Sequence, residues 1–213
     1  MSSIAVRHDL RVRFGVARDQ GARPTCLAFA MSDAHAAAMS PWSPLSCEYL
    51  FYQSKQRVKN PRNTGAATMR AAREALEQDG QPVETAWPYL SALPFDLKQW
   101  KPPAKVGPLY RRASDQIGSG FDDVWDEVAS GKPVLVGMSI STAFLSGASV
   151  VDSVEPVDPT RRHAVVVAAA GERAKKKYLL VRNSWGLAWG LSGYAWLAER
   201  YMAPRILVPV TLN

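Results

Sequence analysis

The sequence predicts an α+β protein in which a helical first half precedes a β-rich second half. Alanine-rich segments without glycine or proline occupy the first half, whereas short, often β-branched apolar runs occupy the second. Of the 213 residues, 47% are hydrophobic and 21% are charged, which is sufficient for a packed core. We expect a single domain over residues 1–213, with a helical lobe over about 10–105, a β lobe over about 106–213 and a cleft between them.

Three helices are predicted in the first half. Residues 26–39 form an alanine-heavy stretch with Thr25 as its expected N-cap. Residues 45–58 form a second helix, opened by Ser46. Residues 66–78 form a third helix with one apolar face, and the Asp-Gly pair that follows is expected to end it.

The segment WKPPAKVGP, residues 100–108, is the expected crossing between the lobes because prolines and glycine dominate it. A helix over 121–130 should follow. Five apolar runs separated by turn residues then predict strands, and these runs are 134–140, 164–170, 178–181, 194–197 and 206–212. We expect them to form a mainly antiparallel, barrel-like sheet.

Charge and hydropathy exclude several classes of protein. The net charge of +7 comes from scattered lysines and arginines, which predicts a solvated face. We find no nucleic-acid recognition motif, so nucleic acid is not an expected partner. No run approaches the roughly 18 apolar residues of a membrane span. The first residues, MSSIAVRHDLRVRF, lack the apolar centre of a classical signal peptide.

Cysteine and histidine usage predicts no metal site and no cofactor. Cys26 and Cys47 are the two cysteines, and they form no disulfide framework. The three histidines are scattered and offer no paired-ligand spacing for zinc. A reducing compartment is therefore expected. Cys47 lies at helical spacing inside LSCEYLFY and is expected to be a core thiol.

Cys26 lies in the stretch RDQGARPTCLAFA, at the first turn of the first predicted helix. The unpaired amides and dipole of a helix N-terminus favour a thiolate. A lone free cysteine is nevertheless more often a buried core residue, so a catalytic role needs a base. His35 lies about 2.5 turns further along the same helix and points away. His8 precedes the first expected element, which leaves His163, at the start of a strand in the other lobe.

Two further residues complete a candidate acyl-transfer site. Asn183 follows the next strand and is placed to orient the ring of His163. Gln20 lies six residues before Cys26, across a turn, where its side chain and the Cys26 backbone N–H would stabilise an oxyanion.

These segments resemble the papain-like cysteine peptidases. DQGARPTCLAFA is similar to the nucleophile segment of that family, HAVVVAAAGE to its histidine strand and RNSWGLAWGLSGYAWL to its asparagine segment. Weaker similarities occur in the same order along nearly the whole chain, in LSCEYLFY, Asn-Thr-Gly at 63–65, AWPY and GKPVLVG. The resemblance implies a two-lobe papain-like fold and hydrolysis of peptide bonds in protein or peptide substrates.

The resemblance also implies roles for matching residues. Cys26 would be the nucleophile and His163 the general base and acid, with Asn183 orienting the ring. Gln20 would donate to the oxyanion, and Trp185 would cover the contact between histidine and asparagine.

Two further positions match the family's substrate-binding segment. Gly65 matches a glycine that lets an extended substrate pair with the cleft wall. Ala66 replaces a frequent second glycine, which predicts a narrower subsite.

Departures from the family pattern surround the nucleophile. Arg23 replaces a cysteine that usually forms a disulfide, Pro24 stiffens the turn, and Leu27 replaces a tryptophan. The cations at 161–162 are expected to lower the pKa of His163 and to favour the Cys26 thiolate.

Other interpretations of the site stay open. The same thioester chemistry serves a transglutaminase or deamidase, and a catalytically inactive fold would serve as a peptide-binding module. Family members usually carry a long inhibitory prosegment, whereas 25 residues precede Cys26. We therefore expect either a trimmed chain or a protein made without a prosegment.

Our expectation for the biological role is a compact bacterial member that acts as a secreted toxin-type effector, with a cognate inhibitor or immunity protein. Its expected location is the cytoplasm, or the cytoplasm of a target cell reached through a dedicated secretion system.

Overall fold

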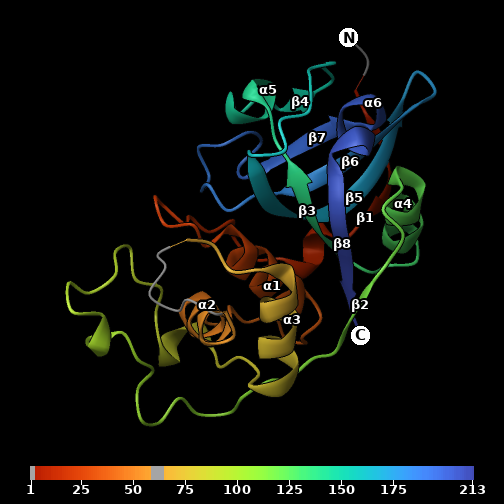
Figure 1. Cartoon of the computed structure of the whole chain (residues 1–213). Coiled ribbons are helices and arrows are strands. Elements are labelled where there is room, and N and C mark those ends of the chain that lie inside the picture. Colours follow the sequence, from red (N-terminus) through yellow and green to blue (C-terminus); the bar gives the residue numbers. More distant parts are fainter. Residues whose placement is uncertain (1–2, 59–64) are drawn as a thin grey trace.

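The computed structural model describes residues 3–58 and 65–213 and contains a helical part beside a large sheet (Figure 1). The helical part contains α1 (Cys26–Ala37), α2 (Cys47–Gln56), α3 (Met69–Gln78) and the short 3-10 helices Arg11–Arg13, Glu84–Ala86 and Leu97–Gln99. The helices α4 (Phe121–Ala129), α5 (Thr142–Leu145) and α6 (Glu199–Met202), with the 3-10 turn Ala203–Arg205, accompany the sheet. The predicted α+β class is confirmed.

Local capping explains where the first helices begin and end. Ser46 caps α2, because its hydroxyl accepts a hydrogen bond from the Tyr49 N–H at 3.1 Å. Thr68 caps α3 in the same way, so this helix begins three residues later than predicted. Gly80, at a φ of 74°, follows the end of α3 in the left-handed conformation that glycine adopts without strain.

The sheet is built from β1 (Ala5–Asp9), β2 (Ser114–Gln116), β3 (Val134–Ser139), β4 (Val150–Val151), β5 (Arg162–Arg173), β6 (Lys176–Arg182), β7 (Tyr194–Ala198) and β8 (Ile206–Leu212). The strand order is β2-β8-β3-β5-β6-β7-β4, and β1 pairs with the second half of β5. All pairs are antiparallel except β4 with β7. Within the described residues β2 and β4 do not pair, so the sheet is open and not the barrel-like structure expected.

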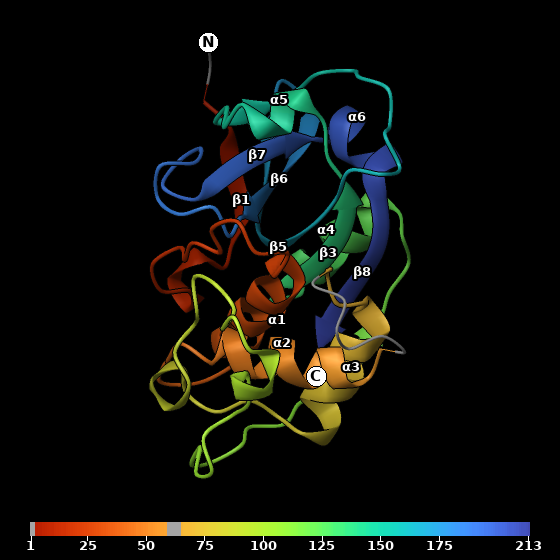
Figure 2. The same cartoon turned by 60° about the vertical axis from the view of Figure 1, so that its left-hand side comes forward.

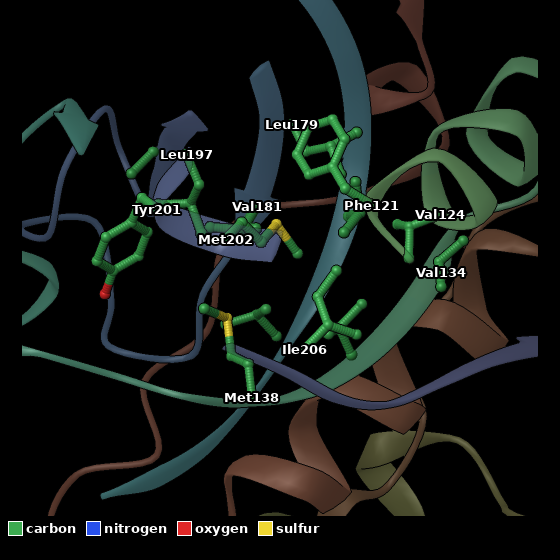
Figure 3. Packing of buried hydrophobic residues seen from close by; sticks show 14 of the residues in the cluster. Phe121, Val124, Val134, Met138, Leu179, Val181, Leu197, Tyr201, Met202 and Ile206 are labelled. Carbon is green, nitrogen blue, oxygen red and sulfur yellow. The ribbon is translucent and has the colours of Figure 1, made fainter. Parts of the chain in front are cut away.

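Strand β5 is buried on both faces, and its alternating side chains divide the core. Val165 and Val167 face a cluster enclosed by α4 and α6, seen from close by in Figure 3. Ala164 and Val166 face the opposite way, toward a second cluster that includes residues of α1 and α3. Because side chains alternate along a strand, one segment joins both halves of the molecule.

Helix α1 lies where the helical part meets the sheet (Figure 2). It begins at Cys26, as predicted, and packs small side chains such as Ala30 and Ala34 in the cluster shared with β5. Close packing of this helix on the strand therefore brings the Cys26 end of α1 to the start of β5.

Five of the strands were predicted, and β1, β2 and β4 were not. His8 was expected to precede the first element, but it lies in β1 and packs edge-on against Trp125. In the part of the chain that the structure describes, the helices are all too short or too polar to cross a bilayer. The same residues contain no group of three metal-ligating side chains.

Candidate active site

Cys26 opens α1 and is partly exposed, in contrast to the rest of that helix, which is buried. Thr25 occupies the predicted N-cap position, but its side chain makes no capping bond. Instead its hydroxyl hydrogen-bonds with Tyr89 Oη at 2.9 Å. The backbone of Ala164, in β5, hydrogen-bonds to the Cys26 sulfur, so the sulfur lies beside the residue that follows His163.

His163 and Asn183 meet where β5 begins and β6 ends. The two side chains are buried, and His163 Nε2 lies 2.7 Å from Asn183 Oδ1. Because an amide oxygen only accepts, Nε2 carries the proton and donates it. This tautomer leaves Nδ1 of the imidazole unprotonated. Asn183 Oδ1 also accepts from the Ser184 N–H at 2.8 Å, which fixes the orientation of the amide.

Aromatic side chains cover the imidazole of His163. The Trp185 ring lies 4.6 Å from the imidazole, centroid to centroid, with the planes 38° apart. Phe144, which is fully buried in α5, contacts both His163 and Trp185. These rings exclude water from the contact between His163 and Asn183, which strengthens that hydrogen bond.

Burial moves Cys26 and His163 toward their neutral forms. It raises the pKa of the Cys26 thiol, while backbone hydrogen bonds, including the one to Ala164, oppose the rise. Burial also lowers the pKa of His163 to about 4, against the opposing hydrogen bond to Asn183. We expected the arginines at 161–162 to lower this pKa, but their side chains are exposed and burial is the largest cause.

Gln20 joins the segment that follows Asn183 to the loop that precedes Cys26. Its Oε1 accepts from the Ser184 hydroxyl at 2.6 Å, and its Nε2 donates to the Arg23 carbonyl at 2.8 Å. The Gln20 N–H also donates to the Ser184 carbonyl at 2.9 Å. A primary amide has two N–H groups, so one donor is committed to Arg23 and the other can serve a ligand.

A buried charge network ties α1 to the end of β6, the strand that immediately precedes Asn183. Arg182 Nε donates to Asp33 Oδ2 at 2.7 Å, and Arg18 Nη2 pairs with the other oxygen of Asp33, also at 2.7 Å. Asp33 is in α1, and Arg182 immediately precedes Asn183. Arg18 Nε and Nη2 both bind Asp33 Oδ1, and Arg182 Nε binds Oδ2. Both carboxylate oxygens are therefore held by charge-assisted hydrogen bonds, which fixes the register between the two halves of the site.

The predicted role of Gly65 and Ala66 in substrate binding stays a prediction. Gly65 and Ala66 precede α3; Gly65 is partly exposed, its carbonyl accepts from Lys55 Nζ at 3.0 Å, and Ala66 is exposed. The next residue, Ala67, packs on the same apolar cluster as Cys26. Asn63 and Thr64, which were part of the resemblance, lie outside the described residues.

Several residues of the site were not found from the sequence. Ser184 lies in the Asn-Ser-Trp motif, and that motif was the signal for it. Phe144 has no distinguishing local pattern, because its place beside His163 depends on the path of α5. Tyr89 lies in the AWPY segment that was noted, but nothing there predicts that its hydroxyl donates to the Gln20 carbonyl at 2.7 Å.

A helix-borne cysteine beside a strand-borne histidine that binds an asparagine is the arrangement of papain-type thiol proteases. The model of the papain family of cysteine proteases matches residues 5–204. The chain therefore belongs to the papain family.

Individual relatives agree with this assignment. The chain is 30% identical over 126 residues to Cysteine proteinase 3 of Entamoeba histolytica, an alignment that covers 58% of this chain and 39% of the relative. A structure from work on the mite allergens Blo t 1 and Der p 1 is similar with a TM-score of 0.83 and 22% identity, over 100% of this chain and 72% of the other. Xylellain, a cysteine protease from Xylella fastidiosa, gives a TM-score of 0.77 at 20% identity, over 99% and 87%.

The structural similarities support the fold. The chain spans between 39% and 65% of the length of the first four curated relatives it matches.

Proposed function

We propose that the protein is a cysteine peptidase that hydrolyses peptide bonds through a thioester on Cys26. The hydrogen bond between His163 Nε2 and Asn183 Oδ1, beside the N-terminus of α1, is the observation that carries the proposal. It supports the proposal because an amide oxygen only accepts, so that Nε2 would donate and Nδ1 would be left to accept the thiol proton.

In the proposed reaction, the Cys26 proton moves to His163 Nδ1 and the sulfur attacks the substrate carbonyl carbon. Gln20 and the Cys26 backbone N–H stabilise the oxyanion. The C–N bond then breaks, and His163 returns the proton to the leaving amine. Water hydrolyses the thioester by the same route in reverse, which regenerates the thiol and releases the acid.

The first test compares wild type with Cys26→Ala on a denatured protein substrate and a chloromethyl-ketone reagent. We expect the substitution to lower cleavage by at least about 1000-fold, since it removes the nucleophile, and to abolish labelling. Cleavage by the variant at the wild-type rate would contradict the proposal. Mass spectrometry of the products distinguishes backbone cleavage from a shift of about one dalton without a cut, which would instead indicate a deamidase.

For the biological role, we propose an effector that acts in a reducing cytoplasm and is restrained by a cognate inhibitor. Support comes from the nucleophile loop, where a buried ion pair of Arg23 and Glu48 occupies the region in which the family usually has a disulfide. Such a loop needs no oxidising compartment. Expression of wild type in bacteria should stop growth, whereas Cys26→Ala should not. Harmless expression of an active wild-type enzyme would contradict this role.

A further inference from the structure

The loop before Cys26 is held by a buried charge that the mechanism above does not use. Arg23 is 7% exposed and its partner Glu48, in α2, is fully buried. Two bonds join them: Arg23 Nη1 donates to Glu48 Oε2 at 2.6 Å and Nη2 to Oε1 at 2.9 Å. Arg23 Nη1 also donates to the Leu90 carbonyl.

The aromatic rings and hydrogen bonds around Arg23 and Glu48 restrain the orientation of both side chains. The guanidinium carbon of Arg23 lies 4.9 Å from the Tyr89 ring centroid and 5.4 Å from that of Phe51. Glu48 accepts two further bonds, from the Leu90 N–H at 3.0 Å and from Trp100 Nε1 at 2.6 Å. Every oxygen of the carboxylate is therefore used. The cost of desolvation offsets much of the attraction in a buried ion pair, so the pair is weak evidence for stability. We therefore ask which residues the pair of Arg23 and Glu48 positions.

Two routes lead from Arg23 to Gln20, one to its side-chain amide and one to its backbone. The Arg23 carbonyl accepts the Gln20 Nε2 bond and the Thr25 N–H, the latter at 2.8 Å, so it links the amide to the start of α1. Tyr89, stacked on the guanidinium, donates its hydroxyl to the backbone carbonyl of Gln20. The side chain of Arg23 thus fixes the backbone that aims the Gln20 donor.

We propose that Arg23, clamped by Glu48, is a positioning residue for the oxyanion donor Gln20. This inference rests on the proposed peptidase function. It predicts that loss of the clamp slows the formation of the tetrahedral intermediate and leaves substrate binding nearly unchanged. A lysine cannot reproduce the paired contact, because it lacks the planar fork of donors.

The decisive test is a double-mutant cycle of Gln20→Ala and Arg23→Met on a peptide amide substrate. We expect Gln20→Ala to lower kcat by about 100-fold, as for other oxyanion donors. Arg23→Met should lower kcat by about 10-fold, a part of the Gln20 effect, with KM within about twofold of wild type. The double variant should be no slower than Gln20→Ala alone, because both act on one donor. Multiplied losses, or a wild-type kcat for Arg23→Met, would overturn the proposal.

A second readout isolates the oxyanion from general damage. A peptide aldehyde forms a tetrahedral adduct with Cys26 whose oxygen occupies the oxyanion site, so its inhibition constant should rise about 10-fold in Arg23→Met. Alkylation of Cys26 by iodoacetamide forms no oxyanion, and its rate should stay within about twofold. Equal fold-changes in the inhibition constant and in the alkylation rate would mean that the substitution only loosened the fold, which would overturn the proposal.

Matched variants keep the test decisive. Arg23→Lys should be intermediate, and Glu48→Gln, which keeps the volume and one acceptor, should reproduce the kcat loss if Arg23→Met does not fold. Arg205→Met is the control, since Arg205 is also buried, stacks on Tyr201 and donates to backbone carbonyls in the sheet part. It should keep kcat and aldehyde affinity. A wild type that cleaves nothing would sink the proposed function, whereas an active wild type with unaffected Arg23 variants would sink this inference alone.

Discussion

Two clusters in this molecule each combine a cysteine, a histidine and a side-chain amide. The first consists of Cys26, His163 and Asn183. The second lies inside the helical part: Cys47 hydrogen-bonds with Ser32, Gln81 Nε2 donates to the Ser32 hydroxyl, and His35 Nδ1 lies 3.2 Å from Gln81 Oε1. Both cysteines open a helix, and burial lowers the pKa of both histidines to about 4.

The two clusters differ in solvent exposure and in the elements that supply their residues. Cys26 is partly exposed and lies where α1 meets the sheet, whereas Cys47 is fully buried among helices. Burial raises the pKa of Cys47 to about 12. A helix N-terminus is therefore not enough to make a nucleophile, because the desolvation of Cys47 outweighs the favourable dipole.

The strongest way to break this comparison is to measure thiol reactivity in the native protein. We expect iodoacetamide to label Cys26 at least about 1000-fold faster than Cys47 at pH 7, since the reactive species is the thiolate and Cys47 has almost none. Peptide mass mapping over time gives both rates, and the same measurement in urea is the control. Comparable native rates would show that the second cluster opens.

The sequence predicted those residues of the candidate site that lie in short local motifs. Gln20, Cys26, His163 and Asn183 could be predicted as candidate site residues because each lies in a short sequence motif, at a turn, at a helix start or at a strand end. The five predicted strands were readable for the same reason, as continuous apolar runs. Strand β1 was missed because its sequence, AVRHD, is mostly polar and has a single valine, and β4 because it has two residues.

Contacts between distant segments could not be predicted in this way. The pair of Arg23 and Glu48 joins residues 25 positions apart, and Arg182 meets Asp33 across 149 positions. No local periodicity encodes such a pairing, since it depends on how α1 packs against α2 and β6. The second cluster was invisible for the same reason, because Gln81 approaches His35 only after α3 has turned back.

The next prediction concerns how the free energy of unfolding depends on pH through the two buried histidines. His35 has a folded pKa of about 4 against a reference value of 6.5, mainly from burial, so the unfolded chain takes up the proton first as pH falls. Its stabilising contribution is complete above about pH 6.5 and is lost toward pH 4. His35→Asn keeps a donor for Gln81 but does not titrate. When the pH falls from 7 to 4.5, the free energy of unfolding of His35→Asn should decrease by about 2 kcal/mol less than that of wild type, measured by urea denaturation.

His163 titrates in both proteins and cancels in that difference. An identical pH dependence in wild type and His35→Asn would mean that the second cluster is hydrated, contrary to its burial.

The smallest expected effect is on stability: Cys47 should contribute to the free energy of unfolding, whereas Cys26 should contribute to activity. Cys47→Ala removes a buried sulfur and its contact with Ser32, so the free energy of unfolding should fall by about 1 kcal/mol, measured by urea denaturation. Its kcat should match wild type, because no hydrogen bond among the described residues joins the Cys47 side chain to Cys26, His163, Asn183 or Gln20. Cys26→Ala is the matched control and should show the reverse, with activity lost and stability nearly unchanged, since Cys26 is partly exposed. If Cys47→Ala also lost activity, the two clusters would be coupled through α1, and their separation by access alone would be wrong.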